Sequence, residues 1–437
     1  MGEGKVIYQE SRKRRRTAIQ MELIFPVNSA LAKTGTQIRI EYIAYPLAVL
    51  LVMLIVSSFT GHWPTDENPY RSYTLQACAW LEGRLDLGQD YSWLELAIVD
   101  GRYYVSFPPF PSFVLLPFAM FYGVNTPDHM ISLAFTLIGV IYALKLFELV
   151  TGSFKNAQLY VLFLFLGNGY LFISMQGWVW YLAQCMCFTL SLMALYYAAI
   201  GRGGLSLTSW ACAIGCRPMV IVYFPLLIAL LFRHWKTVHS DGTIKYWLRE
   251  KWCWTIPVIV IASIYMGLNY ARFGNPFEFG HSYLPEFVRA EEGQFSISYA
   301  IGHLKQLLRL PTVGGKDGAL IYDPYDCMAF WLIAPLTISF LFVWLYAAGF
   351  KRKTHGFELV ALPIMLFVHL MIVCCHRTLG GYQFGNRYLV DMMPYVFYGL
   401  LAFMPSDDRL LLLNIPLFML GFSVNLIGTV AAYNHWI

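Results

Sequence analysis

The chain has 437 residues, of which 58% are hydrophobic and only 13% are charged. Soluble domains average about 25% charged residues, so the composition excludes an ordinary soluble protein and indicates a polytopic membrane protein. The formal net charge of +5 comes from basic loops, and we expect no nucleic-acid partner. Apolar segments follow one another along most of the chain, which favours a single integral membrane domain over two globular ones.

The first 41 residues form a basic segment that we expect to be cytoplasmic. Its basic run, Arg12–Arg16, is not followed by an apolar stretch until about Tyr42. This spacing does not fit a cleaved secretory signal, so the first membrane helix is expected to be a retained anchor. Residues 42–437 are then predicted to form one integral membrane domain.

Apolar segments of about 17–25 residues are long enough to cross the hydrocarbon layer of a membrane. The sequence therefore predicts an all-α bundle of about eleven transmembrane helices. The expected segments are Tyr42–Phe59, Met130–Leu149, Gln158–Ile173, Trp178–Ile200, Leu205–Cys216, Met219–Phe232, Cys253–Tyr270, Cys327–Ala348, Phe357–Cys375, Tyr388–Met404 and Leu410–Ala432. A further apolar run, Phe113–Tyr122, is short and flanked by proline, and we expect an interfacial helix there.

The distribution of basic residues predicts the orientation of the bundle. With a cytoplasmic N-terminus, 20 of the 31 Lys and Arg residues fall in cytoplasmic stretches, as the positive-inside rule requires. The polar stretches 60–129, 272–326 and 376–388 then become loops on the extracytoplasmic face. The first of these is the large loop that carries the expected interfacial helix.

Two adjacent acids follow the first membrane helix, in the stretch T-G-H-W-P-T-D-E-N-P-Y-R. The side chains of Asp66 and Glu67 must diverge because they are neighbours in sequence, so they do not fit the two-carboxylate clamp of a glycosidase. One acid acting as a base, with its neighbour orienting a reactant, fits better. A base alone suffices when the leaving group is as good as a phosphate. A solvated acidic turn is the alternative interpretation.

A departing phosphate also needs a cation to receive its charge. Arg217 lies between two short apolar segments, where a charge costs at least about 2.5–3.5 kcal/mol and usually has a partner or a task. Arg387 follows Gly380, Gly381 and Gly385, which allow a backbone to approach a ligand closely. Both arginines are candidates for binding a phosphate, and snorkelling to the membrane interface is the alternative for Arg217.

Aromatic residues make up 17% of the chain and crowd the first outer loop. They suit either an interfacial belt or a wall on which a sugar stacks. His62, His281 and His376 lie too far apart in sequence to support a metal site. The nine cysteines lack the histidine context of a zinc site, so we predict no structural metal.

The sequence resembles the GT-C superfamily, membrane glycosyltransferases that use polyprenyl-phosphate sugars and include protein O-mannosyltransferases and the aminoarabinose transferase of lipid A. The resemblance rests on W-P-T-D-E-N-P-Y after the first membrane helix, L-E-G-R-L-D-L, D-G-R-Y-Y-V-S-F-P-P-F-P-S-F and the late G-G-Y-Q-F-G-N-R-Y-L-V-D-M-M-P-Y. It implies a GT-C-like bundle in which Asp66 is the catalytic base, Glu67 its companion, and Arg217 and Arg387 face the lipid phosphate. The residues expected to bind substrate are Tyr70, Arg71, Tyr104, His281, Tyr382, Gln383, Asn386 and Tyr388.

These features predict an inverting glycosyltransferase that moves a sugar from a polyprenyl phosphate to a hydroxyl group. Phe107-Pro108-Pro109 replaces the His-Pro-Pro of protein O-mannosyltransferases, so a glycolipid or cell-wall polymer is as good an acceptor as a protein. The scheme requires no tightly bound cofactor, although a divalent cation at the phosphate is chemically reasonable. We expect a bacterial plasma membrane with the active site outside. The alternatives are a flippase for lipid-linked sugar and a non-catalytic scaffold.

Overall fold

The computed structural model describes residues 39–314, 319–321, 327–350, 356–405 and 409–437, so nearly all of the expected basic N-terminal segment lies outside the described residues. Within them, seven helical stretches are long and apolar enough to cross a membrane. They are α2 (Glu41–Thr60), α5 (Asp128–Thr151), α8 (Val179–Ala199), η3 with α10 (Pro218–Val238), α11 through α12 (Ile244–Phe273), α17 (Gly356–Cys375) and α20 (Arg409–Tyr433). The chain is thus an all-α protein with several candidate membrane spans, and the count of about eleven crossings stays a prediction.

The remaining apolar segments form shorter helices because the chain breaks within them. These helices are α6 (Ala157–Leu166), α7 (Tyr170–Ser174), α9 (Gly203–Ile214), α15 (Phe330–Ile333), α16 (Leu336–Phe350), α18 (Arg387–Val390) and α19 (Met393–Phe403). Asn168 separates α6 from α7, since its amide donates to the carbonyl of Leu164 at 2.5 Å and accepts from the N–H of Tyr170 at 2.9 Å. Pro335 precedes α16 and Pro394 is the second residue of α19, and at both places a residue without an N–H favours a new helix over a continuing one.

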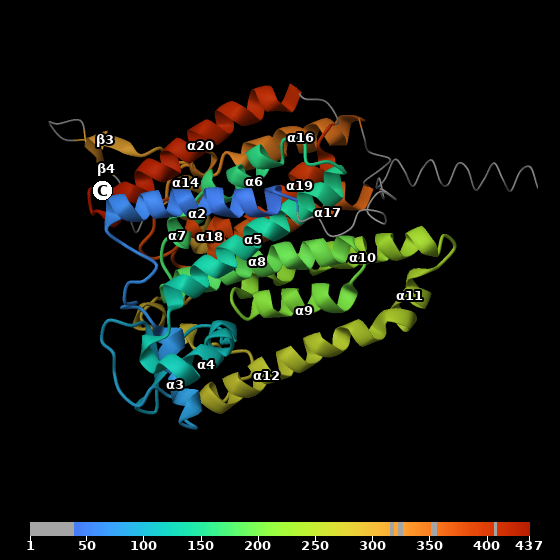
Figure 1. The fold of residues 1–437 in the computed structure, drawn as a ribbon. Helices are drawn as coiled ribbons and strands as arrows, with labels where there is room; N and C mark the ends of the chain where they lie inside the picture. The colour runs from blue at the N-terminus through green and yellow to red at the C-terminus, as the bar shows by residue number, and fades with distance from the viewer. Residues whose placement is uncertain (1–38, 315–318, 322–326, 351–355, 406–408) are drawn as a thin grey trace, which may run out of the picture.

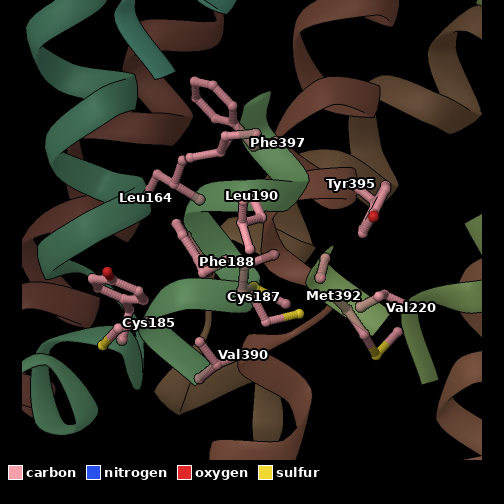
Figure 2. Packing of buried hydrophobic residues seen from close by; sticks show 14 of the residues in the cluster. Leu164, Cys185, Cys187, Phe188, Leu190, Val220, Val390, Met392, Tyr395 and Phe397 are labelled. Carbon is pink, nitrogen blue, oxygen red and sulfur yellow. The ribbon is translucent and has the colours of Figure 1, made fainter. Parts of the chain in front are cut away.

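Helix α8 is the centre of the bundle. Of its most apolar stretch 83% is buried, against 22% for α2 and 11% for the stretch that contains α12. Figure 2 shows Phe188 and Leu190 of α8 gathered with Leu164 of α6 and Phe397 of α19. Helices such as α2 and α12 keep large apolar side chains exposed, as expected for surfaces that face lipid.

The polar stretches contribute small elements near one end of the bundle. The first contains α3 (Ser72–Leu81), a hairpin of β1 (Leu96–Val99) and β2 (Arg102–Val105), and α4 (Phe110–Tyr122). The hairpin pairs Leu96 with Val105 and turns at Asp100-Gly101, whose φ angles of 50° and 72° suit a tight two-residue turn. In Figure 1, α3 and α4 lie at the left, at the same end as α14 (Ser298–Gln306), β3 (Thr312–Gly314) and β4 (Ala319–Ile321). The turn between α10 and α11 lies at the opposite end.

The run expected as an interfacial helix is the separate helix α4. It begins beside Pro109 and ends at Gly123, and it packs on α3 beside the bundle. Two further short helices, η5 (His281–Tyr283) and α13 (Pro285–Val288), follow α12 and complete the set of elements around the candidate site. Their placement brings polar residues from distant parts of the chain together.

Candidate functional site

The acidic pair lies in the turn after α2, and both side chains are exposed. The Oδ2 atom of Asp66 accepts a hydrogen bond from the backbone N–H of Trp63 at 2.6 Å, whereas Glu67 forms an ion pair with Arg71. Arg71 also donates to the carbonyl of Val124 at 3.0 Å. The two carboxylates therefore have different partners, and Arg71 is engaged within the loop rather than directed at an open surface.

Asn68 anchors the acidic turn to the bundle. Its Nδ2 donates to Asp128 at 2.8 Å and to the carbonyl of Gly177 at 2.9 Å, while its Oδ1 accepts from the N–H of Tyr70 at 2.9 Å. The hydroxyl of Thr74 donates to the other oxygen of Asp128 at 2.5 Å. The buried carboxylate at the start of α5 thus has two donors, which offset the cost of its burial and fix the loop.

An aromatic wall connects the anchored loop to the centre of the bundle. The ring of Tyr70 lies 5.0 Å from that of Trp178 and 5.1 Å from that of Trp180, between centroids. The Nε1 of Trp180 donates to Oε2 of Glu95 at 3.0 Å. Burial raises the pKa of the Glu95 carboxyl, against the opposing effects of this hydrogen bond and of the Arg387 charge.

Arg387 is a buried cation, with 3% of its surface exposed. Among the described residues its Nε and Nη1 atoms have no hydrogen-bond partner. Its guanidinium carbon lies 5.1 Å from the ring centroid of Tyr388 and 5.8 Å from those of Trp180 and Tyr181, so aromatic faces compensate part of its charge. Its backbone N–H donates to Gln383 at 2.8 Å, which fixes the start of α18. Two donors of a buried guanidinium are thus left without a protein acceptor, and the role of Arg387 in binding a phosphate stays a prediction.

Arg217 has a different environment, because a carboxylate neutralises it. Its Nε donates to Oδ2 of Asp391 at 2.8 Å, and the ring of Tyr388 lies 4.7 Å from its guanidinium carbon. Gln184 donates both to Asp391 at 3.3 Å and to the carbonyl of Arg387 at 2.8 Å. Tyr388 therefore lies against both arginines, and of the two only Arg387 lacks a paired acid, while the binding of substrate by Tyr388 stays a prediction.

Two histidines lie in the same region. The rings of His281 and His376 are 5.9 Å apart between centroids, and Nδ1 of His281 is buried without a hydrogen-bond partner among the described residues. Burial lowers the pKa of His281 to about 3, with His376 and Arg217 adding to the effect, and burial lowers that of His376 to about 4. Both imidazoles are therefore neutral at pH 7. In the described part of the chain, no three His, Cys, Asp or Glu side chains are grouped to hold a metal ion.

The other predicted substrate-binding residues have contacts that hold the fold. Both ends of the Asn386 amide bind the backbone of Met328, at 3.0 and 2.7 Å. The hydroxyl of Tyr382 donates to the carbonyl of Ala432, and the ring of Tyr104 packs 5.6 Å from that of Phe273, between centroids. Contact of these residues with a substrate stays a prediction.

Three residues of the site were not expected from the sequence, namely Glu95, Trp180 and Asp391. Asp391 follows Arg387 by four residues inside the quoted late motif, so an acid beside the arginines was a readable signal. Glu95 is a single acid in the apolar stretch W-L-E-L-A-I-V, which is a weak signal by itself. Trp180 had no signal that separated it from the many interfacial aromatics.

The arrangement of the helices is similar to that of the solved structure of ArnT, in agreement with the expected ArnT-like bundle. The fold is similar to that of ArnT from Cupriavidus metallidurans bound to undecaprenyl phosphate, with a TM-score of 0.51, 12% identity, and coverage of 90% of this chain and 76% of ArnT. The apo state of the same protein has a TM-score of 0.47 and 12% identity, with coverage of 89% of this chain and 77% of that one. The apo oligosaccharyltransferase of Archaeoglobus fulgidus has a TM-score of 0.45 and 12% identity, with coverage of 91% of this chain and 56% of that one. No family model and no curated protein matches the sequence.

Proposed function

We propose that the chain is an inverting membrane glycosyltransferase that moves a sugar from a polyprenyl-phosphate donor to a hydroxyl acceptor on the extracytoplasmic face. The observation that supports this most strongly is the buried guanidinium of Arg387, whose Nε and Nη1 lack hydrogen-bond partners in the described chain. A buried charge without a hydrogen-bonded partner is unfavourable, and an anionic ligand would relieve that cost. The ArnT structure with a similar fold contains undecaprenyl phosphate, which is such an anion.

The balance of charge favours a donor with a single phosphate. Asp391 forms an ion pair with Arg217, and burial keeps His281 and His376 neutral, so Arg387 is the one cation of this group without an ion-paired acid. A phosphodiester between lipid and sugar carries one negative charge and matches it. A diphosphate would bring a second charge into a site of low polarity without a second free cation.

In the proposed reaction, Asp66 takes the proton from an acceptor hydroxyl. The oxygen attacks the anomeric carbon from the face opposite the phosphate, the bond from that carbon to the phosphate oxygen breaks, and the configuration inverts. Arg387 receives the charge of the departing lipid phosphate, with Arg217 and Tyr388 beside it. A glycolipid, a cell-wall polymer or a protein remains open as the acceptor, and the membrane is a bacterial plasma membrane in this proposal. A divalent cation at the phosphate stays an untested addition.

The test is a transfer assay on purified protein with short-chain polyprenyl-phosphate sugars and a crude glycolipid extract as acceptor. The wild type should release free polyprenyl phosphate. Asp66→Asn should reduce turnover at least about 100-fold, as removal of a general base does, while donor binding is nearly unchanged. Arg387→Ala should instead weaken donor binding. Wild-type turnover in Asp66→Asn would show that another group is the base.

The same assay separates the proposal from the flippase alternative. A flippase in liposomes moves the lipid-linked sugar between leaflets and releases no polyprenyl phosphate. Movement of the donor without release, with every sugar in the panel, would overturn the assignment as a transferase. A protein that neither binds nor moves any of these lipids would favour the scaffold interpretation.

A further inference from the structure

Glu95 is a carboxylate that the proposed reaction does not use, although it lies beside the reacting region. It is the last residue before β1, and the hydroxyl of Ser106 donates to its carbonyl oxygen at 2.8 Å across the hairpin. Trp180 donates to Oε2 of its side chain at 3.0 Å. Two hydrogen bonds thus fix the backbone and the carboxylate, and a fixed carboxylate is suited to recognition.

The second oxygen of this carboxylate is available to a ligand. Among the described residues Trp180 is the only donor to the Glu95 side chain, and that side chain is only partly buried. A carboxylate has about four acceptor positions, so one hydrogen bond leaves most of its capacity unused.

Glu95 and Arg387 both contact the indole ring of Trp180, and they form no ion pair with each other. Trp180 binds Glu95 through its N–H edge, while the guanidinium of Arg387 lies 5.8 Å from its ring centroid. Within the described chain the two charges form no ion pair at 4.0 Å or less, although the charge of Arg387 acts on the Glu95 carboxyl. An acceptor and a cation held apart across an aromatic ring match a ligand that has an anion at one end and hydrogen-bond donors at the other.

We propose that Glu95 binds a hydroxyl or amino group of the sugar being transferred, and so helps to determine which sugar the enzyme accepts. The inference rests on the proposed function, because it places the lipid phosphate at Arg387. The phosphate of the donor lies at the guanidinium, the sugar ring stacks on Trp180 and Tyr70, and a donor group of the ring reaches Oε1 of Glu95. In this arrangement Glu95 binds the sugar and Arg387 binds the phosphate.

The experiment compares two ligands that differ only in the sugar. Binding of a sugar-free short-chain polyprenyl phosphate and of the matching polyprenyl-phosphate hexoses, pentoses and amino sugars is measured by calorimetry in detergent. Glu95→Gln keeps an oxygen for the Trp180 hydrogen bond and removes the charge. We expect Kd for the preferred sugar-bearing lipid to rise roughly 10- to 100-fold, and Kd for the sugar-free lipid to stay within about twofold. Arg387→Ala should weaken both.

The panel of sugars also identifies the donor group, since loss of the charge should cost an amino sugar more than a neutral one. The matched control is Glu82→Gln, which alters an acid of the same loop that pairs with Arg84 away from Trp180. This control should bind every lipid as the wild type does. An intermediate affinity in Glu95→Asp would support a direct contact, because that change keeps the charge and shortens the reach.

Three outcomes would overturn the inference. Equal weakening of both lipids in Glu95→Gln would mean that Glu95 acts on the phosphate region as a whole, and no weakening of either would mean that it touches no ligand. A wild type with no preference for a sugar-bearing lipid over the sugar-free one would exclude sugar recognition here. A wild type that binds neither lipid would overturn the proposed function itself, and the inference with it, which separates the two failures.

Discussion

Arg217 and Arg387 carry the same charge in different surroundings, and that difference decides their roles. Arg217 is held by Asp391, whereas Arg387 has aromatic rings around it and unpaired donors. The sequence presented the two arginines as equivalent candidates for a phosphate. Only the packing of η3 against α18 and α19 shows that one of them is already neutralised.

The ion pair between Arg217 and Asp391 should be important for stability. Asp391 is almost fully buried and the Arg217 side chain is 18% exposed, so Asp391→Asn leaves a largely buried cation without its partner. We expect a loss of about 3 kcal/mol in the free energy of unfolding, at the lower end of the range for broken buried pairs because Arg217 keeps some solvent.

Thermal unfolding in detergent measures this loss as a lower Tm. The exposed pair of Glu82 and Arg84 provides the comparison, since Glu82→Gln should change stability by no more than about 1 kcal/mol. Equal Tm values for the two variants would show that Asp391 does not stabilise Arg217.

At the scale of elements, short and broken helices position the site. Arg387 of α18 and Asp391, which follows α18, contact Trp180 and Gln184 of α8. Pro394 in the first turn of α19 explains the break between α18 and α19, because a proline lacks the N–H that would continue the helix.

Close helix packing also sets the position of α20. A Cβ atom at Gly421 would lie 2.4 Å from the carbonyl oxygen of Gly167, in the break between α6 and α7. Because a backbone atom cannot move aside easily, Gly421→Ala should cost about 1–3 kcal/mol in the free energy of unfolding and lower Tm. Gly267→Ala in α12 is the matched control, since no atom lies within 4 Å of its added Cβ. Since alanine favours a helix over glycine, Gly267→Ala should not lower Tm, and a Tm loss as large as that of Gly421→Ala would show that the close contact is not the cause.

At the scale of the whole molecule, the polar elements are separated between the two ends of the bundle. The α3–α4 region, α14 and the β3–β4 hairpin lie at one end, and the turn between α10 and α11 lies at the other (Figure 1). If the bundle crosses a membrane with its N-terminus inside, the two ends face opposite compartments.

Cysteine labelling tests this orientation. In a Cys253→Ser background, which removes the exposed native thiol, Asp100→Cys should react with a membrane-impermeant maleimide on intact cells. Asp241→Cys, in the turn between α10 and α11, should react only after permeabilisation. The reverse pattern would place the candidate site on the cytoplasmic face and the N-terminus outside, and would contradict the predicted orientation.

The sequence by itself determined an all-α membrane protein, and it predicted the residues of a candidate site. Apolar segments must bury their backbone polar groups in helices, so their length and order predict an all-α membrane bundle, and the described segments are mostly helical, with breaks such as the one between α6 and α7. The motifs likewise indicated Arg217, Arg387, Tyr388 and His281, which the structure brings together.

The tertiary structure decided which of these groups are free to act. Charge compensation depends on neighbours that are distant in sequence, such as Arg217 and Asp391, which are 174 residues apart. The same holds for Glu95 and Trp180, separated by 85 residues. Local sequence patterns give the spacing of side chains along a helix or strand, whereas the packing of the helices sets the pairing of buried charges. The unpaired donors of Arg387 and the position of the Glu95 carboxylate could therefore be found only in the tertiary structure.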